Sequence, residues 1–155
     1  MRAIQLNSSR ASLSIISSMI LSEHAIERVE YGIRNVIGLH YLFSDIEAGN
    51  IVCYSVFEQD KPIGIAWGKI ENKVWTVHAV FDRQKNTQKA LSLIEDKIVP
   101  QYNLTRVTAY IPLKNKAALF MWGRFGAKRQ GIASGAFQDG INKFIDCQIM
   151  AKEYV

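Results

Sequence analysis

Cysteines, clustered metal ligands and long apolar runs are all scarce in this sequence. The two cysteines, Cys53 and Cys147, lie far apart in apolar surroundings, whereas a secreted disulfide framework carries more cysteines at close spacing. We therefore expect buried thiols in a reducing compartment. The three histidines, His24, His40 and His78, have no metal-ligand spacing to one another or to a cysteine, so the sequence predicts no metal site. No apolar run approaches the roughly 20 residues that cross a bilayer, which predicts a cytoplasmic protein without membrane contact.

The remaining composition is that of an ordinary globular protein. Of 155 residues, 48% are hydrophobic and 21% are charged, which predicts one domain over residues 1–155 that folds by itself. The formal net charge of +5 would suit an acidic partner, but lysines and arginines are scattered along the chain. The densest group is small enough to be a solvated surface: Lys114, Lys116, Arg124, Lys128 and Arg129. We therefore do not expect a nucleic-acid partner.

The first 22 residues allow two interpretations. They contain no acidic residue, two arginines and many serines, a composition also found in organellar transit peptides. Alternatively they form the first strand and helix of the domain, because Ile4 and Leu6 alternate and apolar residues then recur at helical spacing through residue 20. We favour the second interpretation, with Ser8 or Ser9 capping the helix.

The rest of the chain alternates between strand and helix patterns. After a helix that begins near Ser22, residues 31–50 look less regular, with Tyr41 and Phe43 expected to pack on the sheet. Period-two runs then predict strands over residues 51–57, 63–68, 74–81, 105–111 and 143–150. Helices are expected over residues 87–98, ended by Pro100, and over residues 115–125. This order predicts a mixed α/β fold with a mostly antiparallel central sheet and helices on both faces.

The last expected helix carries a spaced set of residues: Asn115, Ala118, Met121, Trp122, Gly126 and Ala127. In this spacing the chain resembles the GCN5-related N-acetyltransferase (GNAT) family, whose last helix has Asn, Ala, Leu-Tyr and Gly-Phe at the corresponding places. The order of elements agrees along about the whole chain, and the motif residues fall between Val74 and Ala127. The resemblance implies a GNAT fold that binds acetyl-CoA, with Asn115 and Trp122 beside the cofactor.

Trp122 stands where the family usually has a tyrosine that often protonates the departing coenzyme A thiolate. An indole N–H can donate a hydrogen bond but does not release its proton at workable pH. Tyr110, on the preceding expected strand, could replace that acid or could pack across the sheet.

The family's pyrophosphate loop is the second motif, and it is degenerate here. Its places are taken by Val80, Lys85, Asn86, Thr87, Gln88 and Ala90. The basic and small positions are kept as Lys85 and Ala90, but both loop glycines are replaced, by Asn86 and Gln88. A Cβ hinders the close approach of backbone to phosphate, while the basic residues nearby favour an anion at the helix start. The resemblance implies cofactor binding by these residues, and a solvated helix start is the alternative.

The family often places an acidic base on the strand before this loop, and residues 74–81 contain no acid. His78 is the titratable residue there, and imidazole suits proton transfer near neutral pH. A hydrogen-bonded packing role is the alternative for His78, and Glu71 is a second candidate base.

Two functions of one fold therefore remain open. An N-acyltransferase would move an acetyl group from acetyl-CoA to a small or protein amine. A non-catalytic module would instead bind a protein partner in an assembly, as the missing tyrosine, loop glycines and strand acid suggest. Residues 8–38 also resemble a family of head-assembly proteins of short-tailed bacteriophages, which implies a role in virion morphogenesis in the host cytoplasm.

Overall fold

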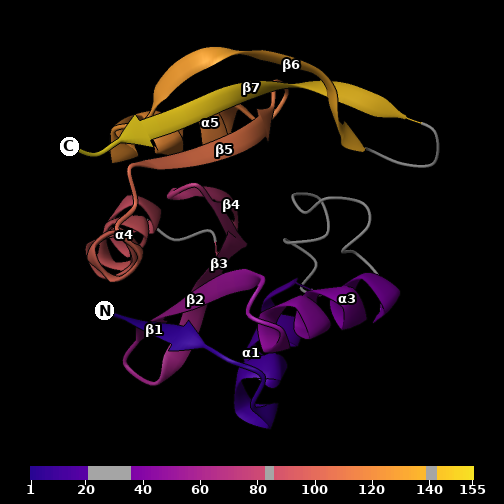
Figure 1. The fold of residues 1–155 in the computed structure, drawn as a ribbon, viewed down its shortest axis with the longest axis vertical. Coiled ribbons are helices and arrows are strands. Elements are labelled where there is room, and N and C mark those ends of the chain that lie inside the picture. The colour runs from indigo at the N-terminus through magenta and orange to yellow at the C-terminus, as the bar shows by residue number, and fades with distance from the viewer. Residues whose placement is uncertain (21–35, 83–85, 139–142) are drawn as a thin grey trace.

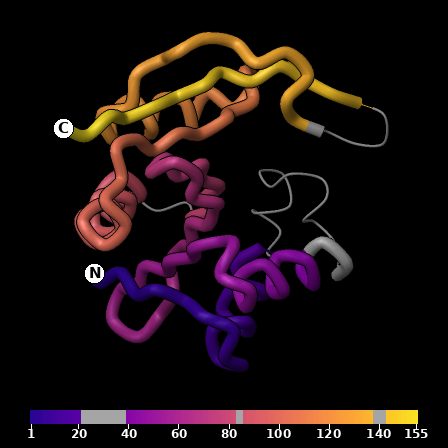
Figure 2. The backbone as a smooth tube through the Cα atoms, viewed as in Figure 1, coloured from indigo at the N-terminus to yellow at the C-terminus, as the bar shows by residue number. Residues whose placement is uncertain are grey.

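The computed structural model describes residues 1–20, 36–82, 86–138 and 143–155 (Figures 1 and 2). The elements in chain order are β1 (Arg2–Leu6), α1 (Arg10–Ile20), α3 (Val36–Glu47), β2 (Ile51–Glu58), β3 (Lys61–Glu71), β4 (Val74–Phe81), α4 (Thr87–Tyr102), β5 (Arg106–Pro112), α5 (Lys116–Phe125), β6 (Lys128–Gln138) and β7 (Phe144–Glu153). The helix expected near Ser22 falls outside the described residues.

The strands form one sheet in the order β1-β2-β3-β4-β5-β7-β6. Neighbouring strands run antiparallel at every pairing except that of β4 with β5, which is parallel. A parallel pair needs a crossover connection, and α4 supplies it. The predicted mixed, mostly antiparallel sheet is therefore confirmed.

Each face of the sheet carries its own apolar core. On one face α4 and α5 contribute buried side chains: Ala90, Leu91, Ile94, Ile98, Leu119, Trp122 and Phe125. On the opposite face α1 and α3 contribute Ile16, Met19, Ile20, Leu39, Leu42 and Ile46. Both faces of the strands between them are buried, as the nearly continuous apolar run of β2 predicts.

Two glycines of β3 make room for aromatic rings of β4. A Cβ on Gly68 would lie 1.9 Å from the Thr76 carbonyl oxygen and 3.0 Å from Trp75 Nε1. A Cβ on Gly64 would lie 2.0 Å from the Phe81 ring. These close approaches let two large rings, Trp75 and Phe81, pack into the core between the sheet and the helices α4 and α5.

The N-terminal segment forms the first strand of this sheet and a helix that packs on it, which confirms the favoured interpretation of that segment. β1 pairs with β2 over all five of its residues, Arg2 to Leu6. The Ser12 N–H donates to Ser9 Oγ at 3.2 Å, so Ser9 caps α1.

Two expectations about elements were wrong, and one strand, β6, was not specifically predicted. Residues 36–47 form the regular helix α3, because Leu39, Leu42 and Ile46 pack at helical spacing on the sheet, while Tyr41 points to solvent. α4 continues past Pro100 to Tyr102, since a proline in the last turn interrupts few helical hydrogen bonds. β6 lacks an alternating pattern, and pairing with β7 holds it as an exposed edge strand.

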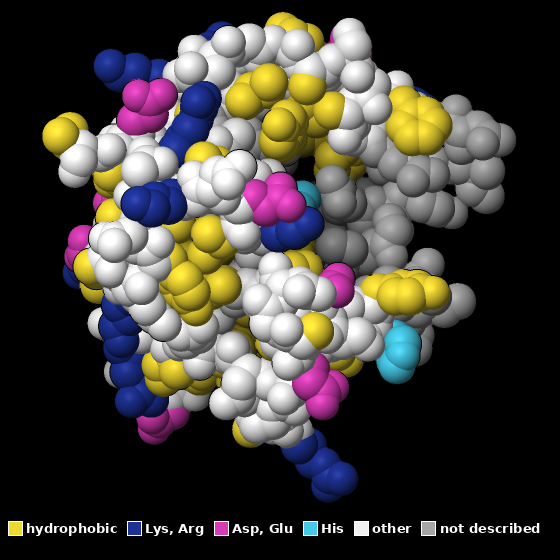
Figure 3. All heavy atoms as spheres, in the orientation of Figure 1, with side chains coloured by type: hydrophobic (Ala, Val, Ile, Leu, Met, Phe, Trp, Pro, Cys, Tyr) yellow, Lys and Arg dark blue, Asp and Glu magenta, His cyan; other side chains and the backbone are white. Residues whose placement is uncertain are grey.

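Four further features concern helices that could span a membrane, metal ligands, cysteines and surface charge. None of the helices in the described ranges is both long and apolar enough to span a bilayer, and no metal-binding cluster of His, Cys, Asp and Glu occurs there either. Both cysteines are buried thiols outside any disulfide, and burial raises the pKa of Cys53 to about 12. On the face shown in Figure 3, Lys and Arg side chains are dispersed rather than gathered in one patch.

Candidate active site

The candidate site lies where the two parallel strands separate. β4 and β5 pair at three successive positions, from Val74↔Arg106 to Thr76↔Thr108. Beyond that point β4 stays paired with β3 as far as Phe81, and β5 stays paired with β7 as far as Pro112. β4 therefore remains paired with β3, and β5 with β7, while β4 and β5 no longer pair with each other. The result is a split in the middle of the sheet, open toward the carboxyl ends of both strands, where open α/β sheets bind ligands.

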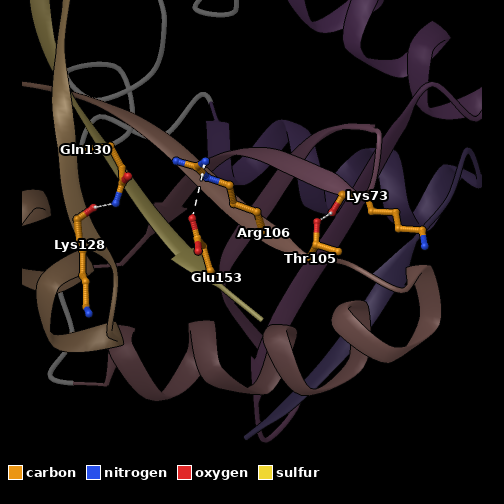
Figure 4. A network of polar contacts seen from close by, with 6 residues as sticks. All are labelled: Lys73, Thr105, Arg106, Lys128, Gln130 and Glu153. Atoms are coloured by element: carbon orange, nitrogen blue, oxygen red, sulfur yellow. Dashed lines mark hydrogen bonds and ion pairs between the residues drawn. The ribbon is translucent and has the colours of Figure 1, made fainter. Parts of the chain in front are cut away.

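The closed end of the split is held by backbone contacts. The Thr105 N–H donates to the Lys73 carbonyl at 2.8 Å, and the Tyr154 N–H donates to the Thr105 carbonyl at 2.9 Å. Beside them, Arg106 Nη1 lies 3.8 Å from Glu153 Oε1 across β5 and β7 (Figure 4). The two parallel strands are thus fixed at one end and diverge from it.

Backbone groups of β4 face the split. The Asp82 N–H donates to the Ile63 carbonyl at 2.9 Å, so the main-chain groups of Asp82 point toward β3. In an antiparallel ladder successive residues direct their N–H and C=O groups to alternate sides. Val77 and Ala79 therefore direct theirs toward β5, and Ala79 lies beyond the last pair of the two strands, Thr76↔Thr108. A ligand in the split meets hydrogen-bond donors and acceptors of the main chain.

A small cavity of about 60 Å³ lies in the split and is lined from both faces of the sheet. Trp67 and His78 come from the α1 and α3 face, where their rings stack with centroids 5.7 Å apart. Ala118 and Trp122 come from α5 on the other face. Tyr110 also lines the cavity, on the His78 side, because it alternates with β5 residues of the α4 and α5 core. The cavity therefore connects the two faces of the sheet.

A larger groove of about 250 Å³ leads to this cavity along α5. It lies between the end of β4, the first turn of α4 and one face of α5, with Phe81, Thr87 and Met121 among its walls. Four residues line the groove and the small cavity alike: Ala79, Asn115, Ala118 and Trp122. The groove and the small cavity therefore adjoin at these residues, between the start of α4 and the split, and together we call them the path.

The caps of α5 fix the side chains on this path. Asn115 Oδ1 accepts a hydrogen bond from the Ala118 N–H at 3.2 Å and begins the helix. Gly126, at φ 105°, ends it in the left-handed conformation that favours glycine, and the Ala127 N–H returns to the Trp122 carbonyl at 3.0 Å. Trp122 is 4% exposed and meets the Phe125 ring edge-on at 5.6 Å. Trp122 is thus a packed wall that the groove and the small cavity share.

A polar cluster anchors the C-terminal end of α5. Lys152 Nζ donates to the Phe125 carbonyl at 3.1 Å and lies 2.7 Å from Glu95 Oε2 on α4. The Tyr154 hydroxyl donates to the same carboxylate. Burial first, and then this hydrogen bond, raise the pKa of Tyr154 well above its ordinary value. α4, α5 and β7 are therefore held in one arrangement around the groove.

The start of α4 has no side-chain cap. Asn86 adopts φ −119° and ψ 24° and makes no capping hydrogen bond through its side chain. Its backbone is outside the left-handed region, so Asn86 is not strained there, and Gln88 is an ordinary helical residue; both still carry the Cβ that the family's glycines lack. Asp82 lines the groove nearby and places a carboxylate where a phosphate would favour positive charge.

The structure brings together five of the residues expected at the site. His78 and Tyr110 line the small cavity, Thr87 lines the groove, and Asn115 and Trp122 line both. Four others line neither space: Val80, Asn86, Gln88 and Ala90. Val80 and Ala90 are buried in the cores, Val80 on the face of α1 and α3. Lys85 lies outside the described residues.

Sequence reasoning missed several walls of the path. Ala79 and Asp82 lie at and just after the end of β4 and were not among the expected site residues, whereas their neighbour Val80 was. Phe137 reaches the small cavity from β6, a strand that the sequence pattern did not predict. The small residue Ala118 was a usable signal, because a helix face that borders a ligand needs room.

Comparison with known proteins shows similarity in structure but none in sequence. No protein-family model and no curated protein matches the chain. A spermidine N-acetyltransferase from Vibrio cholerae in complex with CoA and spermine aligns with a TM-score of 0.76 at 13% identity, over 98% of this chain and 95% of that one. A ribosomal-protein-alanine N-acetyltransferase from Brucella melitensis aligns with a TM-score of 0.75 at 14% identity, over 97% and 99%. RimL, a ribosomal L7/L12 alpha-N-protein acetyltransferase, aligns with a TM-score of 0.81 at 13% identity, over 99% and 91%.

These similarities define the class of fold. The neighbours are N-acetyltransferases, and they align over nearly the whole of both chains. The chain therefore has the GNAT fold that its motif spacing implied.

Proposed function

We propose that this protein is an N-acyltransferase that binds acetyl-CoA in the groove along α5 and transfers the acetyl group to an amine at the split. The observation that carries the proposal is the pair of adjoining spaces at the split: a groove on the α4 and α5 face, and a small cavity lined by residues from both faces of the sheet. Two substrates can then meet from opposite sides. That the solved neighbours act on amines, one of them in complex with CoA, adds support.

The groove offers binding groups of the kind that the cofactor needs. Backbone groups of Val77 and Ala79 can bond an extended amide-containing arm, as an added strand would. The N–H groups in the uncapped first turn of α4 can donate hydrogen bonds to phosphate oxygens, since helix N-termini favour anions. Lys85 and Lys89 would add positive charge there, against the opposing charge of Asp82.

A thioester supplies an activated acyl group and a thiolate that leaves readily. The β4 N–H groups that face the split would polarise the acyl carbonyl. His78, on the opposite face, would take the proton from the attacking amine as the C–N bond forms and the C–S bond breaks. Because a thiol has a pKa of about 8.5, its thiolate can depart near neutral pH without full protonation. A hydrogen bond from Trp122, or a proton from Tyr110, would then suffice in place of the family's tyrosine.

The activity test measures thiol release from acetyl-CoA with a panel of amines that includes polyamines and peptide amino termini, with mass spectrometry of the product. We expect acetylation of at least one amine and a rate loss of about 10²-fold or more in His78→Gln, the range for removal of a general base. Tyr110→Phe should lose less, since the thiolate can leave without full protonation and Trp122 can still donate a hydrogen bond to it. Equal rates in wild type and His78→Gln would show that His78 is not the general base.

A non-catalytic role of the same fold is the alternative, including one in virus head assembly with a protein partner. The buried Trp122 in the tyrosine's place and the carboxylate of Asp82 in the groove favour it. That role predicts neither cofactor binding nor acetyl transfer.

A further inference from the structure

We propose that Trp122 sets the length of the acyl chain that the site accepts, and restricts it to acetyl. This inference rests on the proposed function, because it names the substrate class of the same site. It concerns the one large side chain at the junction of the groove and the small cavity.

Trp122 is the dominant wall at that junction. The other three residues shared by the two spaces are Ala79, Ala118 and Asn115, all much smaller. Because Trp122 lines both spaces, a thioester bound along α5 with its acyl group in the small cavity would lie against Trp122. The ring therefore faces the acyl group at the point where any extra methylenes would lie.

The volumes limit what fits beyond the junction. The groove measures about 250 Å³ and the small cavity about 60 Å³. One water-sized group needs about 10–15 Å³ of such volume, so the small cavity holds about four to six. The sulfur, carbonyl carbon, carbonyl oxygen and methyl carbon of an acetyl thioester are four heavy atoms, which fit. A butyryl thioester adds two more and reaches the upper limit of the space, so it fits poorly at best.

The Trp122 ring is not free to move aside. It is 4% exposed and packs edge-on against Phe125, 5.6 Å between ring centroids. The Phe125 carbonyl is bonded in turn by Lys152, which also pairs with Glu95. Turning the ring out would break close packing at the end of α5, so the limit on chain length is rigid.

The test compares the binding of free CoA, acetyl-CoA and butyryl-CoA by calorimetry without an acceptor amine. In the wild type we expect butyryl-CoA to bind at least about 10-fold more weakly than acetyl-CoA, since a poorly fitting methylene costs about 10–200-fold. Trp122→Ala should reduce that ratio to about threefold or less. Because Trp122→Ala leaves a large void in the core, Trp122→Phe with propionyl-CoA provides a second, milder test.

Phe120→Ala is the matched control, since this aromatic residue of the same helix is 68% exposed and lines neither space. It should keep the wild-type ratio. The inference is overturned if the wild type binds butyryl-CoA as well as acetyl-CoA, or if both Trp122 variants keep the wild-type ratio while binding free CoA normally. If free CoA fails to bind the wild type, the proposed function fails as well, and the two failures are thereby distinguished.

Discussion

Substituting alanine for glycine at three positions should change stability with different signs. Gly68→Ala should be the most damaging, because its Cβ would lie 1.9 Å from the Thr76 carbonyl oxygen, whereas real Cβ contacts are not found under 3.0 Å. The strands must therefore separate by about 1 Å at that point. The obstacle is backbone, and Thr76 is paired with Lys69 on one side and Thr108 on the other, at the last rung before the split.

The size of the stability loss depends on whether backbone or a side chain must move to make room for the new Cβ. Overpacking that displaces side chains costs about 1–3 kcal/mol, so a clash with paired backbone should cost about 3 kcal/mol or more. In a chain of this length 1 kcal/mol corresponds to about 2–4 °C, which predicts a loss of about 6–12 °C in the melting midpoint. Gly64→Ala meets the Phe81 ring at 2.0 Å and should cost somewhat less, since a side chain can turn.

Gly123→Ala is the control, with the opposite sign. Gly123 lies inside α5 with nothing within 4 Å of a Cβ, so alanine should stabilise by about 1 kcal/mol through helix propensity. Thermal and urea unfolding of the three variants measure the series. A Gly68→Ala variant within about 1 kcal/mol of the wild type would refute the reasoning, because it would mean that β3 and β4 are not packed as described.

Two further changes test single features of the fold. Lys73 holds φ 63° in the two-residue turn between β3 and β4, so Lys73→Gly should stabilise by about 0.5–1 kcal/mol in urea unfolding; an unchanged or lower midpoint would argue against that turn geometry. The pKa of Cys53 rises from 9.0 to about 12 on folding, so its contribution to stability is complete below about pH 9 and is lost as the pH rises toward 12. Between about pH 8 and about pH 10.5 the wild type should therefore lose about 2 kcal/mol more than Cys53→Ala, and equal losses in urea titrations would contradict a buried thiol.

The sequence predicted the elements whose own residues carry a periodic signal. β2, β3 and β4 alternate clearly, and α5 has both its apolar face and its terminal residues, Asn115 and Gly126. α3 was missed because glycines near its start outweighed its apolar spacing, and tertiary packing of Leu39 and Leu42 decides the outcome. β6 carries glycines and two register shifts, so only its partner β7 makes it a strand.

The site was predictable only where a motif residue also faces the right way. Asn115 and Trp122 both line the candidate site because helical spacing puts them on one side of α5. Val80 lies in the core on the α1 and α3 face because a strand sends alternate side chains to opposite faces, and the motif spacing does not say which face borders the groove. The split itself arises from the loss of pairing between β4 and β5, which no local pattern in either strand reveals.

The most direct test of the account is a calorimetric titration of coenzyme A into the wild type, Ala118→Phe and Ala48→Phe. Ala118 lines both the groove and the small cavity, so a phenyl ring there should block the path, whereas Ala48 is exposed after α3 and serves as the matched control. The account predicts saturable binding by the wild type and Ala48→Phe, and a loss of at least about 10-fold in affinity, about 1.4 kcal/mol, in Ala118→Phe. Absence of binding by the folded wild type at millimolar coenzyme A would contradict the central claim, and equal affinity in all three proteins would place the cofactor outside the groove.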